Sequence, residues 1–252
     1  MQTSDDAVLG GRLTLRQPLK GHRVGHDAIL LAAATGGRAG ERAVEFGAGV
    51  GAAGLALAQR VPDLRVVLVE IDADLCALAA HNAQANGLSA RVRAIAADVA
   101  DVHALAAAGL RPGEADRVLM NPPFNDPARH NVSPDARRKL AHVAPAGLLA
   151  CWIGSAAALL KPQGVLTLIW RADGLDAVLA ALTPAFGAVA VLPVLPKEGA
   201  APIRVLVGAV RGAEPGRRTL APLVLNDASG RPSDAAEAIL RRGGVLPLAA
   251  IA

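Results

Sequence analysis

The residues with the clearest potential for chemistry are Asn121 to Phe124, an Asn-Pro-Pro-Phe turn that directly follows the apolar run 117–120. The side-chain oxygen of Asn121 and the backbone carbonyl of Pro122 can each accept one N–H of an amino group. Phe124 can stack on the ring that carries this amine. Two acceptors that grip a conjugated amine turn its lone pair outward, so the turn predicts methyl transfer to a planar nitrogen.

A glycine cluster upstream predicts where the methyl donor binds. Gly47, Gly49 and Gly51 form a GxGxG pattern, and Gly49, Gly51 and Gly54 also match the dinucleotide fingerprint GxGxxG. Glycine allows the backbone to turn tightly and lets a ligand approach without a Cβ in the way. Glu70 ends the next apolar run, where a carboxylate can accept both ribose hydroxyls; a plain surface carboxylate is the alternative.

Three positions favour S-adenosylmethionine over NAD as the ligand. Glu45 precedes the glycines, where its charge can answer the amino-acid or sulfonium end of the donor. Asp98 ends the third expected strand, placed to accept from an adenine amine, although a helix N-cap is a competing role. Asn121 follows the fourth strand, although Asn-Pro-Pro can also be only a rigid turn. Because ligands bind outside the carboxyl ends of parallel strands, we expect these residues to share one crevice.

The elements that must position these residues alternate between extended and helical patterns. Strands are expected at 42–46, 65–70, 90–96, 116–120, 165–170, 188–195 and 203–210. Helices are expected at 51–60, 74–86, 102–108, about 142–160, 175–182 and 234–242, with Asp74 as the N-cap of the second. This order predicts an α/β, Rossmann-like fold: a seven-stranded, mostly parallel sheet with an antiparallel last strand and helices on both faces.

Composition narrows the setting. The chain has 252 residues, 52% of them hydrophobic, and a formal net charge of +4, which permits an anionic macromolecular partner but also fits a simple Ala/Arg/Gly bias. No run of about 18 uncharged apolar residues predicts a membrane span. The acidic N-terminus is unlike a signal peptide, and we expect both Cys76 and Cys151 to be buried without a disulfide. A cytoplasmic location is therefore expected.

Two further groups of residues were weighed for binding roles. Basic side chains after the Asn121 turn can contact RNA phosphates, or can belong to a solvated loop: Arg129, His130, Arg137, Arg138 and Lys139. His22 and His26 stand four residues apart but have no third candidate ligand, so no metal site is expected.

Taken together, these motifs resemble class I S-adenosylmethionine-dependent methyltransferases with an Asn-Pro-Pro-Phe/Tyr signature. The segments 15–17, 21–32 and 203–207 also resemble the bacterial tRNA(Val) adenine-N6 methyltransferase family. The resemblance implies methyl transfer from S-adenosylmethionine to the exocyclic N6 amine of an adenosine in RNA, with tRNA as the expected substrate. Many relatives carry Tyr where this chain has Phe124; both rings stack, but the inference about substrate is weakened.

The resemblance also implies roles for single residues. Gly47, Gly49 and Gly51 would line the donor, Glu70 would bind its ribose and Asp98 its adenine. Asn121 and Pro122 would hold the target amine, with Phe124 against the target base. Asp27 would help to close the donor pocket, or would be the N-cap of a helix over 28–34.

The same resemblance implies a domain organisation. Residues 1–40 would pack on the cofactor side, 41–211 would form the methyltransferase domain, and 212–252 would extend that domain. No prediction is made for the oligomeric state.

Other functions share part of this pattern. A protein glutamine N5-methyltransferase of the release-factor type is the second candidate, although that group usually carries an N-terminal helical domain and only about 40 residues precede the first expected strand here. Enzymes that methylate rRNA or DNA bases share the signature too. A binding module without turnover and a dehydrogenase are further alternatives, and the intact Asn121 turn argues against both.

Overall fold

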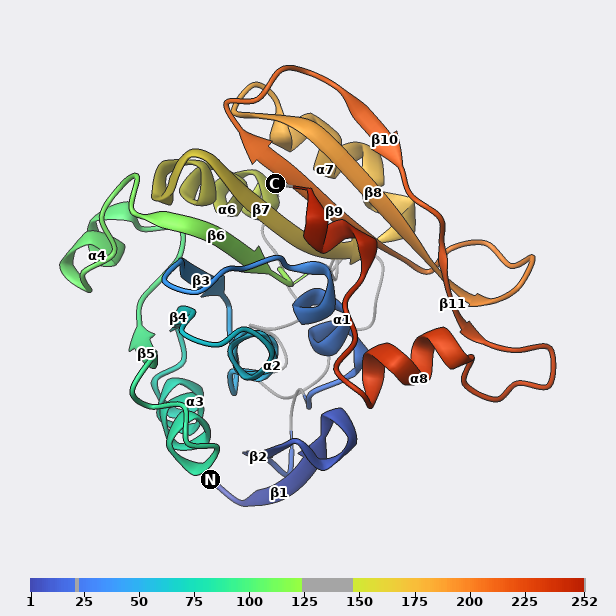
Figure 1. Ribbon diagram of the computed structural model, residues 1–252. Helices are drawn as coiled ribbons and strands as arrows, with labels where there is room; N and C mark the ends of the chain where they lie inside the picture. The colour runs from blue at the N-terminus through green and yellow to red at the C-terminus, as the bar shows by residue number, and fades with distance from the viewer. Residues whose placement is uncertain (21–22, 124–146, 252) are drawn as a thin grey trace.

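The computed structural model describes residues 1–20, 23–123 and 147–251 of the chain (Figure 1). Its centre is one large mixed sheet. The strands of this sheet are β3 (Arg42–Phe46), β4 (Arg65–Glu70), β5 (Val92–Ala96), β6 (Ala115–Met120), β7 (Leu160–Arg171), β8 (Phe186–Lys197), β9 (Arg204–Arg211), β10 (Arg217–Thr219) and β11 (Leu223–Asn226). Their order is β10-β8-β9-β7-β6-β3-β4-β5, and β11 also pairs with β8.

Helices cover both faces of the sheet, as Figure 1 shows for α6 and α7 on one side and α1 and α2 on the other. The α-helices are α1 (His26–Ala34), α2 (Ala52–Arg60), α3 (Ala73–Ala85), α4 (Val102–Ala107), α6 (Leu148–Leu159), α7 (Leu175–Leu182) and α8 (Asp234–Leu240). The short 3-10 helices are η1 (Leu9–Gly11), η2 (Ala172–Gly174) and η3 (Pro247–Ala250). A separate hairpin of β1 (Thr3–Val8) and β2 (Leu13–Pro18) packs outside the main sheet.

The register of the central strands brings their carboxyl ends to one edge. Phe46 at the end of β3 pairs with Val69 of β4 and with Met120 of β6, all in parallel. β7 continues the parallel order beside β6, and β9 then runs antiparallel between β7 and β8. The loops after β3, β4 and β6 therefore emerge side by side.

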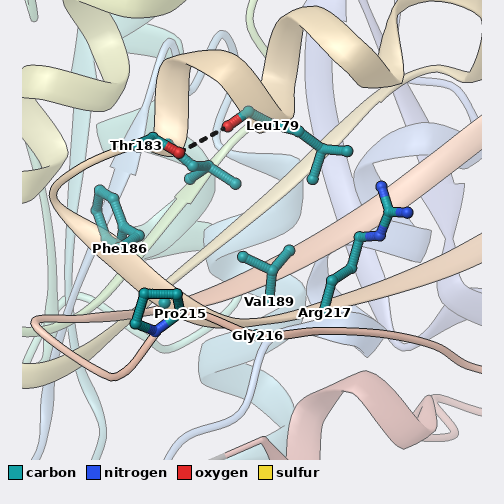
Figure 2. A pocket seen from close by; sticks show the side chains of 9 residues that line it. Leu179, Thr183, Phe186, Val189, Pro215, Gly216 and Arg217 are labelled. Carbon is teal, nitrogen blue, oxygen red and sulfur yellow. Dashed lines mark hydrogen bonds between the residues drawn. The ribbon is translucent and has the colours of Figure 1, made fainter.

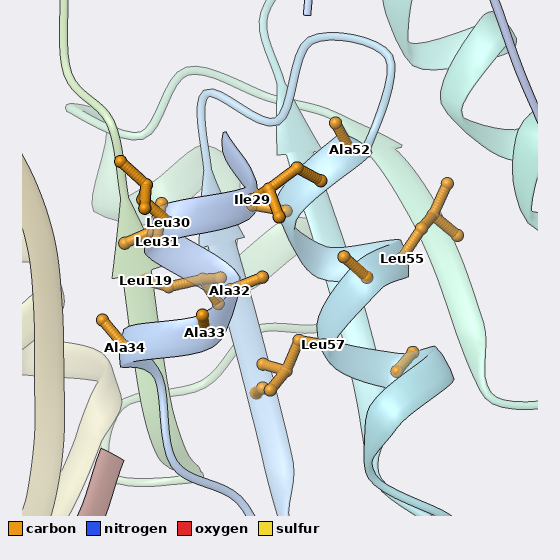
Figure 3. Close-up of a cluster of buried hydrophobic side chains, with 14 of the residues drawn as sticks. Ile29, Leu30, Leu31, Ala32, Ala33, Ala34, Ala52, Leu55, Leu57 and Leu119 are labelled. Carbon is orange, nitrogen blue, oxygen red and sulfur yellow. The ribbon is translucent and has the colours of Figure 1, made fainter. Parts of the chain in front are cut away.

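Alternation along the buried strands divides the core into two clusters, one on each face. In β6, Leu119 faces the cluster that contains α1 and α2, whereas Val118 and Met120 face the cluster that contains α6 and α7. Figure 3 shows Leu119 among the leucines and alanines of α1 and α2. Small alanines on these two helices allow them to lie close to the sheet and to each other.

The expected α/β architecture is confirmed, including the antiparallel pairing of the two late strands. The helix over 175–182 begins and ends where the sequence predicts. The expected count of seven strands was too low, because β10 and β11 add to the edge at β8. Both are short, and their residues alternate too little to be recognised by period.

Two local predictions were wrong. Asp72, not Asp74, is the N-cap of α3, and its carboxylate accepts from the backbone N–H groups of Asp74 and Leu75 at 2.9 and 3.1 Å. Cys76 is buried as expected, but Cys151 is exposed because it lies on the outer side of α6. No helix in the described ranges combines the length and the apolar character needed to cross a membrane.

Candidate active site

The glycine loop that joins β3 to α2 is the first part of the site. Gly47, Gly49 and Gly51 all have positive φ angles, of 63°, 56° and 87°, which L-residues with a Cβ rarely adopt. A Cβ on Gly47 would lie 2.6 Å from Cη2 of Trp152, and one on Gly51 would lie 2.8 Å from Cδ1 of Leu68. A Cβ on Gly49 would meet no described atom within 4 Å. The outer glycines are thus needed for packing, while Gly49 leaves open space.

Glu70 fastens this loop to the end of β4. Its side chain is only 8% exposed. Oε2 accepts from the Gly49 N–H at 2.8 Å, and Oε1 accepts from the Asp72 N–H at 3.0 Å. An ionised carboxylate has roughly four acceptor positions, so capacity for further donors such as ribose hydroxyls remains. The sequence paired Glu70 with the glycines, and the structure brings them together.

Glu45 lies beneath the loop rather than at its surface. Its side chain is 5% exposed, and Oε2 accepts from the Gly54 N–H in the first turn of α2 at 2.7 Å. Burial raises the pKa of Glu45 to about 8; the Gly54 hydrogen bond opposes this rise, and the nearby Glu70 charge adds to it. A Cβ on Gly54 would lie 2.7 Å from Oε2 of Glu45. Gly54 therefore allows α2 to close over a carboxyl that readily takes up a proton.

The Asn121 turn begins next to the glycine loop, because Met120 pairs with Phe46. Asn121 is partly buried and Pro122 is buried. Oδ1 of Asn121 is buried and has no hydrogen-bond partner among the residues that the structure describes. Leaving a buried acceptor unsatisfied costs roughly 1–3 kcal/mol. Such a group at the carboxyl edge of the sheet is a ready acceptor for an N–H of a bound molecule.

The ends of β4 and β5 supply two more side chains at the same edge. Asp98 is exposed, and its Oδ1 accepts from the backbone N–H of Ala100 at 2.9 Å. The alternative role as N-cap is wrong, since Asp101 caps α4 by accepting from His103 and Ala104. Asp98 therefore remains open to a ligand.

Ile71 is a candidate that the motif analysis missed. It directly follows Glu70 and is 64% exposed, an unusual position for a large aliphatic side chain. The Ala97 N–H donates to the Glu70 carbonyl at 3.0 Å, so Ile71 stands close to the strand end that leads to Asp98. A flat ring could rest against it. The available signal was a large apolar residue immediately after a strand-end carboxylate.

Asp27 has a different role from either that was considered. Gly25 is the N-cap of α1, so Asp27 does not cap this helix. Asp27 Oδ2 instead lies 2.9 Å from Nε of Arg204, and the ion pair joins the start of α1 to the start of β9. His22, Phe124 and the basic residues 129–139 lie outside the described residues.

A hollow of about 310 Å³ lies elsewhere on the molecule. Leu179, Thr183, Phe186, Pro215 and Arg217 are among the residues around it (Figure 2). Phe186 begins β8, which runs parallel to β7, so this hollow is at the amino edge of the sheet, opposite to the glycine loop. Among the described residues, none of those expected to do chemistry lines it.

Comparison with known proteins agrees with this geometry. The family model described as methyltransferase small domain matches residues 24–193, more than half of the 252 residues. A crystal structure of a predicted O-methyltransferase from Agrobacterium tumefaciens has a TM-score of 0.73 and 27% identity, and the match covers 87% of this chain and 98% of that one.

Curated relatives carry two kinds of names. A tRNA1(Val) (adenine(37)-N6)-methyltransferase of Porphyromonas gingivalis is 35% identical over 61% of this chain and 60% of the relative. A release factor glutamine methyltransferase of Chlorobaculum tepidum is 33% identical over 59% of this chain and 52% of the relative. The chain therefore spans between half and two thirds of the length of these relatives.

Proposed function

The chain belongs to the methyltransferase small domain family, and we propose that it transfers a methyl group from S-adenosylmethionine to the exocyclic N6 amine of an adenosine in RNA, with tRNA as the substrate class. The observation that carries this proposal is the buried, unpartnered Oδ1 of Asn121 beside the glycine loop. The similarity to tRNA1(Val) (adenine(37)-N6)-methyltransferases supports the choice of RNA.

The residues at the carboxyl edge fit the donor. Gly49 leaves room for close approach, Glu70 has acceptor capacity left for ribose hydroxyls, and Asp98 is exposed to accept from the adenine amine. Ile71 offers an apolar surface to the adenine ring. Glu45 lies under the loop and would answer the amino-acid end of the donor from below. When bound, S-adenosylmethionine supplies an electrophilic methyl group on a positively charged sulfur.

Asn121 and Pro122 would act on the other reactant. The Asn121 Oδ1 and the Pro122 carbonyl each accept one N–H of the target amine, which directs its lone pair away from the ring. As positive charge develops on the nitrogen during attack, both acceptors bind it more strongly. Phe124 would stack on the target base. No protein nucleophile is required, so neither cysteine takes part.

The domain assignment is part of this proposal. Residues 41–211 would form the catalytic domain, 1–40 would pack on its donor side, and 212–252 would extend it. Bonds from the hairpin to α3 and the packing of Ile251 against Gly208 of β9 support this arrangement. An enzyme that acts on tRNA would work in the cytoplasm.

A second candidate is glutamine N5-methylation of a release factor. The side-chain amide of glutamine is also a planar nitrogen that two acceptors can grip, and a relative of that name is 33% identical. The geometry around Asn121 serves both substrates equally, so the substrate pool must decide.

The test is incubation of the chain with radiolabelled S-adenosylmethionine and, separately, tRNA, rRNA, DNA and protein pools. Label that appears in N6-methyladenosine from tRNA supports the proposal. Label only in protein would replace it with the second candidate, and label in no pool from a chain that does bind the donor would leave only a binding module. An Asn121→Ala chain serves as the negative control in every pool.

A further inference from the structure

The hairpin of β1 and β2 is attached to α3 by two asparagine side chains. Asn82 Oδ1 accepts from the Arg16 N–H at 2.8 Å, and its Nδ2 donates to the Arg16 carbonyl at 3.0 Å. Asn86 repeats the pattern one turn later on Thr14, with its Oδ1 at 3.0 Å from the N–H and its Nδ2 at 2.8 Å from the carbonyl. The two amides thus replace the peptide groups of a neighbouring strand along β2.

Asn82 makes a third hydrogen bond that Asn86 does not. Its Nδ2 also donates to the carbonyl of Val50 at 3.0 Å. The Asn82 side chain is 0% exposed, so water cannot replace this donor. Asn86 Nδ2 instead donates to the carbonyl of Asn82 at 2.7 Å, within its own helix region.

Val50 is the point at which the glycine loop most needs an anchor. It stands between Gly49 and Gly51, and glycine retains more backbone freedom than any other residue. The remaining loop bonds hold N–H groups: Ala48 to the Val69 carbonyl at 2.9 Å, Gly49 to Glu70 at 2.8 Å and Gly51 to the Ala48 carbonyl at 2.8 Å. Asn82 is the group that fixes the Val50 carbonyl, and it also fixes the hairpin.

We infer that Asn82 is a positioning residue of the methyl donor site: it holds the Val50 carbonyl so that the glycine loop is already shaped for the donor, and it ties that loop to the β1–β2 hairpin. The inference rests on the proposed function, because the donor is S-adenosylmethionine. Asn82 itself contacts no reacting group, so its loss weakens donor binding and spares the chemical step.

The test compares Asn82→Ala and Asn82→Asp with Asn86→Ala as the matched control. Aspartate keeps the shape of Asn82 and can still accept from Arg16, but it places an oxygen against the Val50 carbonyl. Calorimetry with S-adenosylhomocysteine, the product form of the donor, measures affinity without turnover. We expect both Asn82 variants to bind roughly tenfold more weakly, the loss of about one net hydrogen bond. Asn86→Ala should stay within about twofold of wild type.

Two further readouts separate positioning from general loosening. Amide hydrogen exchange of the ligand-free chain should quicken at Gly49 and Gly51 in the Asn82 variants only, whereas exchange at Thr14 and Arg16 should quicken in all three. The KM for the donor should rise while kcat at saturating donor stays within about threefold. If the alanine variant does not fold, the isosteric aspartate variant carries the comparison.

Equal loss of affinity in Asn82→Ala and Asn86→Ala would overturn the inference, because it would show only a loosened hairpin. Unchanged affinity and unchanged exchange at the loop in folded Asn82 variants would overturn it as well. A wild-type chain that binds no S-adenosylhomocysteine would instead overturn the proposed function, and the exchange at Gly49 and Gly51 would still decide whether Asn82 shapes the loop.

Discussion

Two buried polar side chains differ from the rest of the core at the level of single residues. Oδ1 of Asn121 lacks a partner among the described residues, and the Glu45 carboxyl is held beneath α2 with a raised pKa. Neither arrangement favours the free energy of folding on its own. Both lie at the carboxyl edge of the sheet, where a ligand can use what the fold leaves unsatisfied.

Replacing Asn121 by alanine tests the acceptor role. We expect turnover to fall roughly 100-fold, because the amine loses its alignment, while donor affinity stays within about twofold. The free energy of unfolding should be unchanged or slightly higher, since an unpaired buried amide is removed. Asn226→Ala is the control, as its Nδ2 only donates to the Pro196 carbonyl at 2.8 Å. Weaker donor binding with normal turnover of the bound donor would contradict the role.

Glu45 predicts how stability depends on pH. Its pKa is about 8 in the folded chain against 4.5 for the free side chain, so the folded state binds the proton more tightly. Its favourable contribution is complete below pH 4.5 and is lost as pH rises through 8, with a slope of at most about 1.4 kcal/mol per pH unit. Urea unfolding from pH 5 to 8 should show a shallower decline for Glu45→Gln, which keeps an acceptor for Gly54. Parallel curves for the two proteins would refute this.

At the level of elements, the sequence predicted the strands and helices well because their patterns are local. Val44 and Phe46 alternate with Ala43 and Glu45 in β3, and the glycines mark the turn that follows. What it missed depends on contacts between distant segments. The hairpin is held by Asn82 and Asn86, whose partners lie 66 and 72 residues away.

The candidate site could be predicted in part for the same reason. Glycines and strand-end carboxylates announce themselves by type and position, so Glu70 and the loop were found. The burial of Glu45 and the choice of cap were not, because an aspartate near a helix start reads alike whether it caps the helix or binds a ligand. Asp72 and Asp74, or Asp98 and Asp101, differ only in how the chain turns.

The pair Asp98 and Asp101 gives a test at this scale. Asp101→Ala removes the cap of α4 and should lower the free energy of unfolding by about 1 kcal/mol, with donor affinity unchanged. Asp98→Ala should weaken donor binding several-fold and alter stability less. Chemical denaturation and calorimetry on both variants give the two values. If both variants lost stability alone, Asp98 would have no part in binding.

Considered as a whole, the molecule separates its two reactants along one edge. The donor residues follow β3, β4 and β5, whereas Asn121 follows β6, on the side that leads to β7, β9 and β8. The hollow near Phe186 is on the opposite edge and takes no part. Substrates of quite different size can therefore reach Asn121 without disturbing the donor loop, which agrees with the mixed names of the relatives.

A polyanionic substrate predicts a response to salt that belongs to the whole surface. The formal net charge is +4, so tRNA affinity should fall at least about tenfold between 50 and 200 mM KCl as counterions compete. Donor affinity should change less than about twofold over the same range. Fluorescence anisotropy of labelled tRNA and calorimetry of the donor provide the measurements. Affinity for tRNA that ignores salt would argue for a protein substrate.

The contact between Trp152 and the glycine loop gives this protein an optical reporter of its own. Trp152 stands edge-on to Phe46, with ring centroids 6.3 Å apart, and its indole closes the space beside Gly47. The chain has two tryptophans, so Trp170→Phe would leave a single emitter at the loop. Its emission should then change saturably as the donor is titrated, which would let occupancy be followed without label, substrate or turnover.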